Sequence, residues 1–305
     1  MDVPAIGDDR SRPAARDPSA PAPAAPSGLS RLLAGVDRVG AAAIAVGHYV
    51  LYLVGFLYLS VKMVWVGRHQ GLRDVVRQVL LQVYFTGVQG VVPVAALALV
   101  VGAVVIAEGL AALGPLSGAE GLGRLVTVVV LREIAPLLTG MIVIVRSVTA
   151  IAAELGVMRV QRETEALEAM GVSPILHLVT PRLLGGVLAL AGLNVAFDVV
   201  SLTGGALVAR LLAPVPAEVF ARAVLSAVAP ADLLALVVKV GVGGIGIFLI
   251  ACYHGMDVGS APTEVPVAVS RAALRAVVFL VTLHAAVSLL VLATRGPSAL
   301  LGGVL

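Results

Sequence analysis

The chain has 305 residues, of which 59% are hydrophobic and 13% charged, more apolar material than the core of one soluble domain can bury. Only 4% of the residues are aromatic and the apolar runs are aliphatic and unbroken, which excludes an alternating outer-membrane barrel and predicts an all-α integral membrane protein. The net charge of +3 is small and spread along the chain, so no nucleic-acid partner is expected, and the single cysteine excludes an internal disulfide or a cysteine-based metal cluster.

The amino-terminal part is predicted to stay out of the bundle. Residues 1–28 contain six prolines and no apolar run, which predicts a disordered tail without the features of a secretory signal. Residues 29–82 are predicted to form an elbow of helices that enters one leaflet without crossing it. Its last part, 72–83, has apolar residues on one face and charged ones on the other, as in a helix lying in the membrane interface.

The rest of the chain, 83–305, is predicted to be a membrane domain with five spans. Crossing about 30 Å of hydrocarbon takes roughly 20 apolar residues. Five windows meet this requirement: 84–107, 125–148, 183–210, 231–252 and 276–294. A sixth, 48–66, is apolar but carries Lys62, and counting it as a span would place the arginine-bearing tail outside the cell. Five spans are therefore favoured over six.

Arginine positions predict the orientation of the spans, because basic residues collect in cytoplasmic connections. The connections after the second and fourth windows carry Arg146, Arg159, Arg162, Arg182, Arg271 and Arg275. The alternate connections and their edges carry only Arg124, Arg210 and Arg222. The connection between the second and third spans is therefore expected in the cytoplasm, with the amino end inside and the carboxyl end outside.

That connection, residues 152–181 and here termed the knob, is the most charged part of the domain. Residues 154–170 favour one helix, in which Arg159 and Glu163 are spaced as an i,i+4 pair. Gly171 suits the position just past a helix end, and Pro174 prevents the helix from continuing. A short apolar amphipathic piece would follow, with Pro181 heading the third span. By itself the pattern fits a rigid projection or an ordinary solvated loop equally well.

Three motifs in 131–184 resemble the signature region of the MlaE/YrbE permeases. The first contains Arg132, Glu133 and Pro136. The second contains Ala153, Glu154, Gly156 and Met158. The third runs over 165–174 and ends with Pro181 and Arg182. MlaE/YrbE proteins are the membrane subunits of ABC transporters that work with MCE proteins to move lipids, and the similarity extends over about 83–294.

The resemblance implies a cytoplasmic coupling helix between spans 2 and 3 that docks on a separate ATPase subunit. Its expected contact residues are Glu154, Met158, Arg159, Arg162, Glu165, Glu168, Met170 and Gly171. It further implies a permease homodimer or a heterodimer with a paralogue, an MCE-type substrate-binding protein, membrane lipid as cargo, and a place in the inner (plasma) membrane. ATP and Mg²⁺ would bind to the ATPase, and no cofactor is expected in this chain.

Ionisable residues inside the spans are the second group of candidates. Arg132 and Glu133 lie well inside the second window, where an ionisable group costs at least about 2.5–3.5 kcal/mol unless it is partnered or faces water. They could form a structural ion pair, or a polar ring on the substrate path, which is where the resemblance places them together with Lys239. Asp198 lies at a similar depth to Lys239, so those two could also pair. His284 is expected to be a core histidine.

Other functional classes are less consistent with the sequence. An HExxH pair, a GxSxG elbow or two intramembrane aspartates would indicate a membrane enzyme, and none is present, so the chain is not expected to be an enzyme. A secondary transporter, or another ABC importer permease for a hydrophobic small molecule, is the alternative, although no inverted repeat is visible. Glycine-rich runs at 185–192 and 241–248 allow close helix packing, within one chain or between two.

Overall fold

A computed structural model describes residues 40, 44, 47–62, 72–113, 121, 123, 125–212 and 216–295. The predicted tail, 1–28, and much of the predicted elbow lie outside these residues. The chain divides into two compact units, Met1–Leu51 and Tyr52–Leu305. The candidate residues all belong to the second unit, and the description below concerns that unit.

The second unit is helical wherever it has regular structure, and its described residues contain no strand. The α-helices are α2 (Leu72–Thr86), α3 (Val91–Leu113), α5 (Ala135–Val143), α6 (Thr149–Val160), α7 (Glu163–Ala169), α8 (Thr180–Leu212), α9 (Ala217–Ala227), α10 (Pro230–Met256) and α11 (Glu264–Arg295). A short 3₁₀ turn, η2 (Val88–Gly90), joins α2 to α3. Three π-helical turns lie within longer helices: η3 (Thr127–Ile134), η4 (Ile144–Val148) and η5 (Ile175–Val179).

Five helical stretches of the described chain are long and apolar enough to cross a membrane, which confirms the predicted number of spans. They are Arg73–Ala112, Thr127–Val160, Ile175–Leu212, Pro230–Met256 and Glu264–Thr294. Residues 48–62, the described part of the segment 48–66, are helical and are not among these five stretches, and residues 63–66 lie outside the described residues. Each stretch is longer than its predicted window, because helices continue into polar sequence beyond the hydrocarbon, where hydrophobicity no longer marks them.

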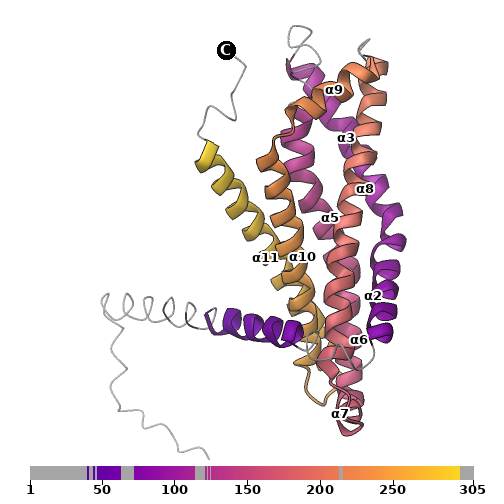
Figure 1. Cartoon of the computed structure of the whole chain (residues 1–305), viewed down its shortest axis with the longest axis vertical. Helices are drawn as coiled ribbons and strands as arrows, with labels where there is room; N and C mark the ends of the chain where they lie inside the picture. Colours follow the sequence, from indigo (N-terminus) through magenta and orange to yellow (C-terminus); the bar gives the residue numbers. More distant parts are fainter. Residues whose placement is uncertain are drawn as a thin grey trace, which may run out of the picture. The chain divides into compact units, whose positions relative to one another are not determined.

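The amphipathic helix at 72–83 differs from its prediction. It is the first part of the stretch Arg73–Ala112, and α2 packs lengthwise against α8 (Figure 1). A Cβ atom at Gly185 of α8 would come within 2.7 Å of Gln82 Cβ, which shows how closely the two helices approach. The predicted boundary between 82 and 83 falls inside α2, and the division of the chain into an elbow and a following domain stays a prediction. Gln82 therefore lies on the face of α2 that contacts another helix of the same chain.

Glycines of the two predicted packing runs bring α8 and α10 close to their neighbours. Gly186 on α8 faces the ring of Phe248 on α10, and Gly246 on α10 faces the ring of Phe279 on α11. Both contacts form within one chain, so at these positions the runs are intrachain seams. Gly192, by contrast, has nothing within 4 Å of its Cβ position.

The two arginine-bearing connections lie at the same end of the bundle (Figure 1). A Cβ atom at Gly156 of α6 would lie 3.2 Å from Val258, in the connection between α10 and α11, and 3.3 Å from Val265, in the first turn of α11. The short helix α9 lies at the opposite end (Figure 1). This arrangement agrees with the predicted orientation, in which both arginine-bearing connections face the cytoplasm.

Candidate functional site

The knob contains two helices where the sequence predicts one over 154–170. Helix α6 ends at Val160, and Arg162 then adopts a left-handed conformation with φ 60°, so that α7 starts in a new direction. The prediction of a single helix is wrong for this reason. Good helix propensity on both sides does not reveal a turn at a residue that has no glycine-like signal.

Contacts across this turn replace the predicted pair between Arg159 and Glu163. The Arg159 guanidinium donates a hydrogen bond of 3.2 Å to the buried Thr164 hydroxyl and lies 4.0 Å from the Glu165 carboxylate. The i,i+4 pair is absent because its two residues belong to different helices. Arg159 instead fixes α7 against the end of α6.

The far end of α7 closes as predicted. Gly171 has φ +77°, its N–H donates to the Glu168 carbonyl at 2.9 Å, and the Val172 N–H donates to the Leu167 carbonyl at 2.9 Å. This pair of hydrogen bonds is a Schellman motif, which satisfies the last carbonyls of a helix. The position predicted for Gly171 is confirmed, and α7 is held at both ends.

The third span begins earlier than predicted. A helix starts at Pro174 and continues through η5 into α8, so the apolar piece after Pro174 is not separate and Pro181 lies inside a helix. Proline lacks the N–H that an interior helical position needs. The wider π-turn directly before it redistributes these bonds, and the Arg182 guanidinium donates to the Leu178 carbonyl at 2.9 Å.

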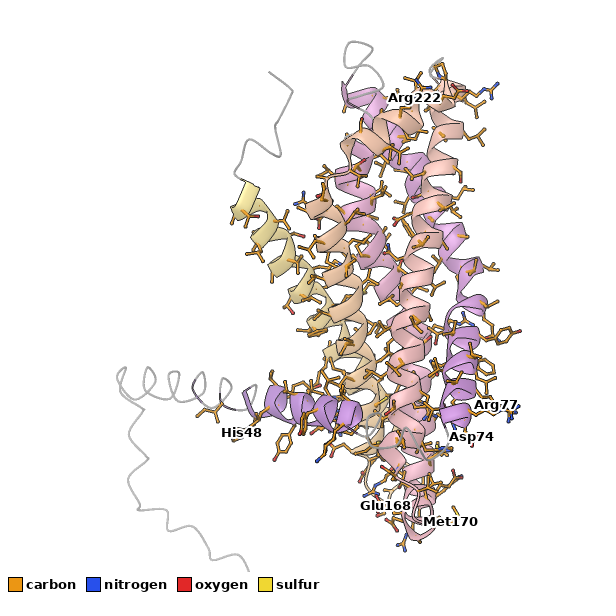
Figure 2. The ribbon with its side chains drawn as sticks, in the orientation of Figure 1. His48, Asp74, Arg77, Glu168, Met170 and Arg222 are labelled. Carbon is orange, nitrogen blue, oxygen red and sulfur yellow. The ribbon has the colours of Figure 1, made fainter. Side chains whose placement is uncertain are left out.

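The eight predicted coupling residues fall into two groups. Arg159, Arg162, Glu165, Glu168, Met170 and Gly171 lie at the tip of the knob, where Figure 2 labels Glu168 and Met170. The Met170 side chain is 69% exposed, high for a large apolar residue. Glu154 and Met158 lie earlier in α6, away from the tip, and line a cleft. Glu154 forms a salt bridge of 2.9 Å with Arg182.

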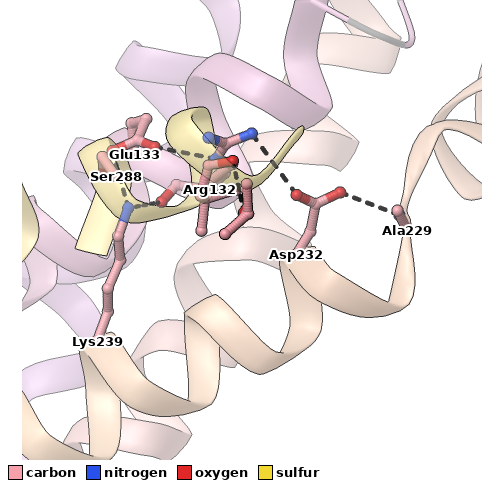
Figure 3. A network of polar contacts seen from close by, with 8 residues as sticks. Arg132, Glu133, Ala229, Asp232, Lys239 and Ser288 are labelled. Carbon is pink, nitrogen blue, oxygen red and sulfur yellow. Dashed lines mark hydrogen bonds and ion pairs between the residues drawn. The ribbon is translucent and has the colours of Figure 1, made fainter. Parts of the chain in front are cut away.

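A charged network lies inside the bundle, on η3 and α10 (Figure 3). The Lys239 side chain is 1% exposed, and its ammonium donates to Glu133 Oε2 at 2.8 Å and to the Arg132 carbonyl at 2.8 Å. Glu133 Oε1 lies 3.1 Å from Arg132 Nε. The three polar residues that the sequence singles out for the substrate path therefore meet in one place.

Two further residues complete the network, and the sequence analysis missed both. The Ser288 hydroxyl on α11 donates to Glu133 Oε2 at 2.7 Å, and Asp232 at the start of α10 lies 3.7 Å from Arg132 Nη1. Asp232 also accepts a hydrogen bond of 3.0 Å from the Ala229 N–H (Figure 3). An acidic residue in a first helical turn, next to an alanine–proline start, is a capping signal that could have identified Asp232.

The network joins the second, fourth and fifth spans through compensated charges. The buried lysine has a carboxylate and a carbonyl as partners, as an ammonium in an apolar interior requires. The Glu133 side chain remains 38% exposed, so one side of the network is accessible from outside this chain. The geometry is that of an ion pair between helices with one open face.

The predicted alternative pair between Lys239 and Asp198 is wrong. Asp198 Oδ2 accepts a hydrogen bond of 3.0 Å from Asn194 on its own helix, while Lys239 is directed to Glu133. Similar depth in the membrane does not fix which helix faces meet. His284 is buried and its Nδ1 donates to the Leu280 carbonyl at 2.9 Å, as expected for a core histidine.

A helical bundle of five spans, with an ionic cluster inside the spans and a folded projection at one end, defines a multi-pass membrane transport subunit. The family model described as Permease MlaE matches residues 79–290, and the chain belongs to this family. It is therefore the permease of an ABC transporter, located in the inner membrane, and its role is transport and not enzymatic catalysis.

Two of the following three curated proteins with similar sequences are named as permeases. A probable ABC transporter permease protein of Rickettsia felis is 28% identical over 177 residues, which cover 58% of this chain and 68% of the relative. The intermembrane phospholipid transport system permease protein MlaE of Haemophilus influenzae is 32% identical over 127 residues, or 42% and 49% of the two chains. The chloroplastic protein TRIGALACTOSYLDIACYLGLYCEROL 1 of Arabidopsis thaliana is 30% identical over 137 residues, or 45% and 39%.

Proposed function

We propose that the chain moves phospholipid or another lipid across or out of the inner membrane, together with an MCE protein and a separate ATPase. Family membership supports a transport role driven by an ATPase partner. The name of the Haemophilus influenzae relative, a permease of intermembrane phospholipid transport, supports lipid as the cargo. In this proposal ATP and Mg²⁺ bind to the ATPase, and this chain has no cofactor of its own.

The knob is the proposed contact with the ATPase. Its support is the construction of α7, which is fixed to α6 by Arg159 at one end and closed by the Schellman motif at Gly171 at the other. A short element held at both ends transmits displacement to the spans on either side of it. The exposed Met170 side chain then provides apolar surface for a partner, because single exposed ion pairs contribute only about 0–1 kcal/mol each.

Two copies of the chain, or this chain with a close paralogue, would enclose the lipid path between them. The charged network, with Arg132, Glu133 and Lys239, is proposed to line that path. This role is supported by the partial exposure of Glu133, whose side chain is 38% exposed while that of Lys239 is buried. An MCE protein would exchange lipid with the opening at the end opposite to the knob.

The alternatives from other classes lose support. A secondary transporter has no need of an ATPase, and membership of an ABC permease family argues against it. An importer permease for a hydrophobic small molecule would use the same knob, so it differs from the proposal only in cargo. Stimulation of ATP hydrolysis by lipid separates these two possibilities.

Cysteine cross-linking tests the contact with the ATPase. The native Cys252 is fully buried, so a cysteine introduced at an exposed site is the reactive one among the described residues. We expect Met170→Cys to cross-link to a copurifying ATPase subunit, identified by mass. Arg222→Cys, on α9 at the opposite end, is the matched control and should give no such product (Figure 2).

The opposite outcome would overturn the proposal. If Arg222→Cys captures the ATPase and Met170→Cys does not, the knob lies on the wrong side of the membrane. If the purified complex in detergent hydrolyses ATP equally well with and without added phospholipid, phospholipid is not its cargo.

A further inference from the structure

A polar cleft of about 580 Å³ opens between α2, the η4–α6 region and the start of the third span. Its volume falls within the range of small-ligand sites. Nine polar side chains line it: Gln78, Gln82, Thr86, Gln89, Arg146, Ser147, Glu154, His177 and Arg182. The cleft is separate from the charged network around Lys239, since the two share no residue.

The cleft lies where the spans leave the hydrocarbon on the knob side. Arg146 is near the end of the second apolar window, 125–148, and Arg182 immediately precedes the third, 183–210. Gln82 likewise precedes the first window, 84–107. The three elements therefore bring their polar residues together at the level of the lipid headgroups, on the side that the arginines identify as cytoplasmic.

Arg146 is the cation in this cleft whose charge no acidic side chain compensates. Its Nη2 donates to the side-chain Oε1 of Gln89 at 2.9 Å, whereas its buried Nη1 has no hydrogen-bond partner among the described residues. A guanidinium partly removed from water, next to the hydrocarbon, is costly without an anion. Arginine is also the side chain best suited to bidentate contacts with phosphate.

Arg182 provides a second cation, and its present partner is exchangeable. Its guanidinium lies 2.9 Å from the Glu154 carboxylate, but the Glu154 side chain is 61% exposed. The Arg182 side chain itself is only 12% exposed, so it needs an anionic partner, and because the Glu154 carboxylate remains open to water, an anion in the cleft can replace it as that partner.

The rim of the cleft is apolar and faces away from the bundle. Leu81 is 46% exposed and Phe85 is 56% exposed, and both line the cleft on α2. Acyl chains would pack on these residues while a headgroup enters the cleft. An apolar rim beside a basic interior favours a lipid over a soluble anion.

We propose that this cleft binds the phosphate headgroup of an anionic phospholipid from the cytoplasmic leaflet, with Arg146 and Arg182 as its phosphate ligands. The site goes beyond the transport function, because it requires only that the chain crosses the membrane. It would remain if the contact between the knob and the ATPase were disproved. Because Glu154 and Met158 of α6 also line the cleft, a bound headgroup would contact the α6 part of the knob.

Fluorescence quenching by brominated lipid tests the site in the full-length protein. Leu81→Cys, labelled with a fluorophore, is placed in phosphatidylcholine nanodiscs that contain brominated phosphatidylglycerol or, in the parallel sample, brominated phosphatidylcholine. We expect phosphatidylglycerol to quench the label preferentially. Adding Arg146→Gln should reduce that preference about tenfold, as the loss of one charge-assisted contact predicts.

Matched variants separate a headgroup site from general attraction to negative lipid. Arg210→Gln removes an arginine at the other end of α8 and should leave the preference unchanged. Arg146→Lys keeps the charge but not the bidentate geometry and should lose part of the preference. Retained circular dichroism and monodisperse elution show that the Arg146 variants remain folded.

Three results would overturn the proposal. The first is equal quenching by the two brominated lipids in the parent. The second is an unchanged preference in folded Arg146→Gln protein. The third is loss of the preference in Arg210→Gln as well, because the preference would then report general attraction to negative lipid and not binding in the cleft.

Discussion

Lys239 and Glu133 are 106 residues apart in the sequence, and their side chains meet at 2.8 Å inside the bundle. The contact fixes the rotation of α10 relative to η3, because only one face of each helix carries the charge. It also explains how both ionisable groups are tolerated within the spans. The pair is a structural element of the fold as well as the proposed polar lining of the lipid path.

Removing one member of the pair should destabilise the protein more than removing both. We expect Lys239→Met to cost about 3 kcal/mol, because Glu133 Oε2 loses its ammonium partner and only Arg132 remains as a cation beside the carboxylate. Adding Glu133→Gln to Lys239→Met should recover most of that loss. Thermal unfolding in detergent, monitored by circular dichroism, measures both. A double variant as unstable as Lys239→Met would show that the charge of Glu133 is not what destabilises it.

Glu133→Ala separates the structural role from transport. If Glu133 serves the lipid path, the variant should assemble with its partners yet transport lipid at an altered rate. Size-exclusion chromatography of the complex and a lipid-transfer assay measure the two properties. Loss of the complex in detergent would instead show that the ion pair is needed mainly for assembly.

Gly171→Pro should uncouple the knob without affecting membrane insertion. Proline cannot adopt φ +77° and lacks the N–H that bonds to Glu168, so the Schellman motif is lost. With Glu165→Lys added, lipid-stimulated ATP hydrolysis by the reconstituted complex should fall to the unstimulated level. Gly192→Ala, at a helical glycine with open space around it, is the control and should retain full stimulation. Normal stimulation in the double variant would contradict coupling through α7.

Gly102→Ala should separate α3 from α8. The added Cβ atom would collide with the Ser201 backbone carbonyl, which cannot move without displacing α8. Overpacking of this kind costs about 1–3 kcal/mol, so the unfolding midpoint in detergent should fall. Gly241→Ala adds the same methyl group where nothing lies within 4 Å and should leave the midpoint unchanged or raise it. Equal midpoints for the two variants would refute the close approach.

Arg162→Gly should stabilise the knob. Arg162 adopts a left-handed conformation with φ 60°, which costs a non-glycine residue about 1 kcal/mol and a glycine almost nothing. Gln161→Gly, at the preceding position with φ −78°, should destabilise it instead. Limited proteolysis of the knob compares the two, and faster cleavage of Arg162→Gly would argue against a strained turn.

Hydrophobicity sufficed to predict the number of spans, because about 20 apolar residues are needed wherever a helix crosses a bilayer. It could not predict where the helices end, since Glu154 and Arg159 continue the second span in polar surroundings. The turn at Arg162 escaped prediction because its backbone conformation is set by contacts of Arg159 and Thr164, and not by local propensity.

The contacts between ionisable side chains inside the spans were only partly predictable. Arg132, Glu133 and Lys239 are conspicuous as charges in apolar sequence, but choosing Glu133 over Asp198 as the partner of Lys239 requires the rotation of each helix about its axis. Ser288 carries no charge and therefore gave no signal. The family resemblance, carried by the motifs over 131–184, was the stronger guide, and the family match confirms it.

The π-helical turn η3 carries Arg132 and Glu133, which belong to the charged network. The turns η4 and η5 carry Arg146 and His177, which line the cleft. Each such turn contains one residue more than an α-helical turn needs. Passing that surplus residue to a neighbouring turn rotates the intervening side chains by about 100° while the ends of the helix stay in place. The π-turns thus allow a local change of helical register at the positions of these charged residues. Such a change alters the direction of a charged side chain without moving the whole helix.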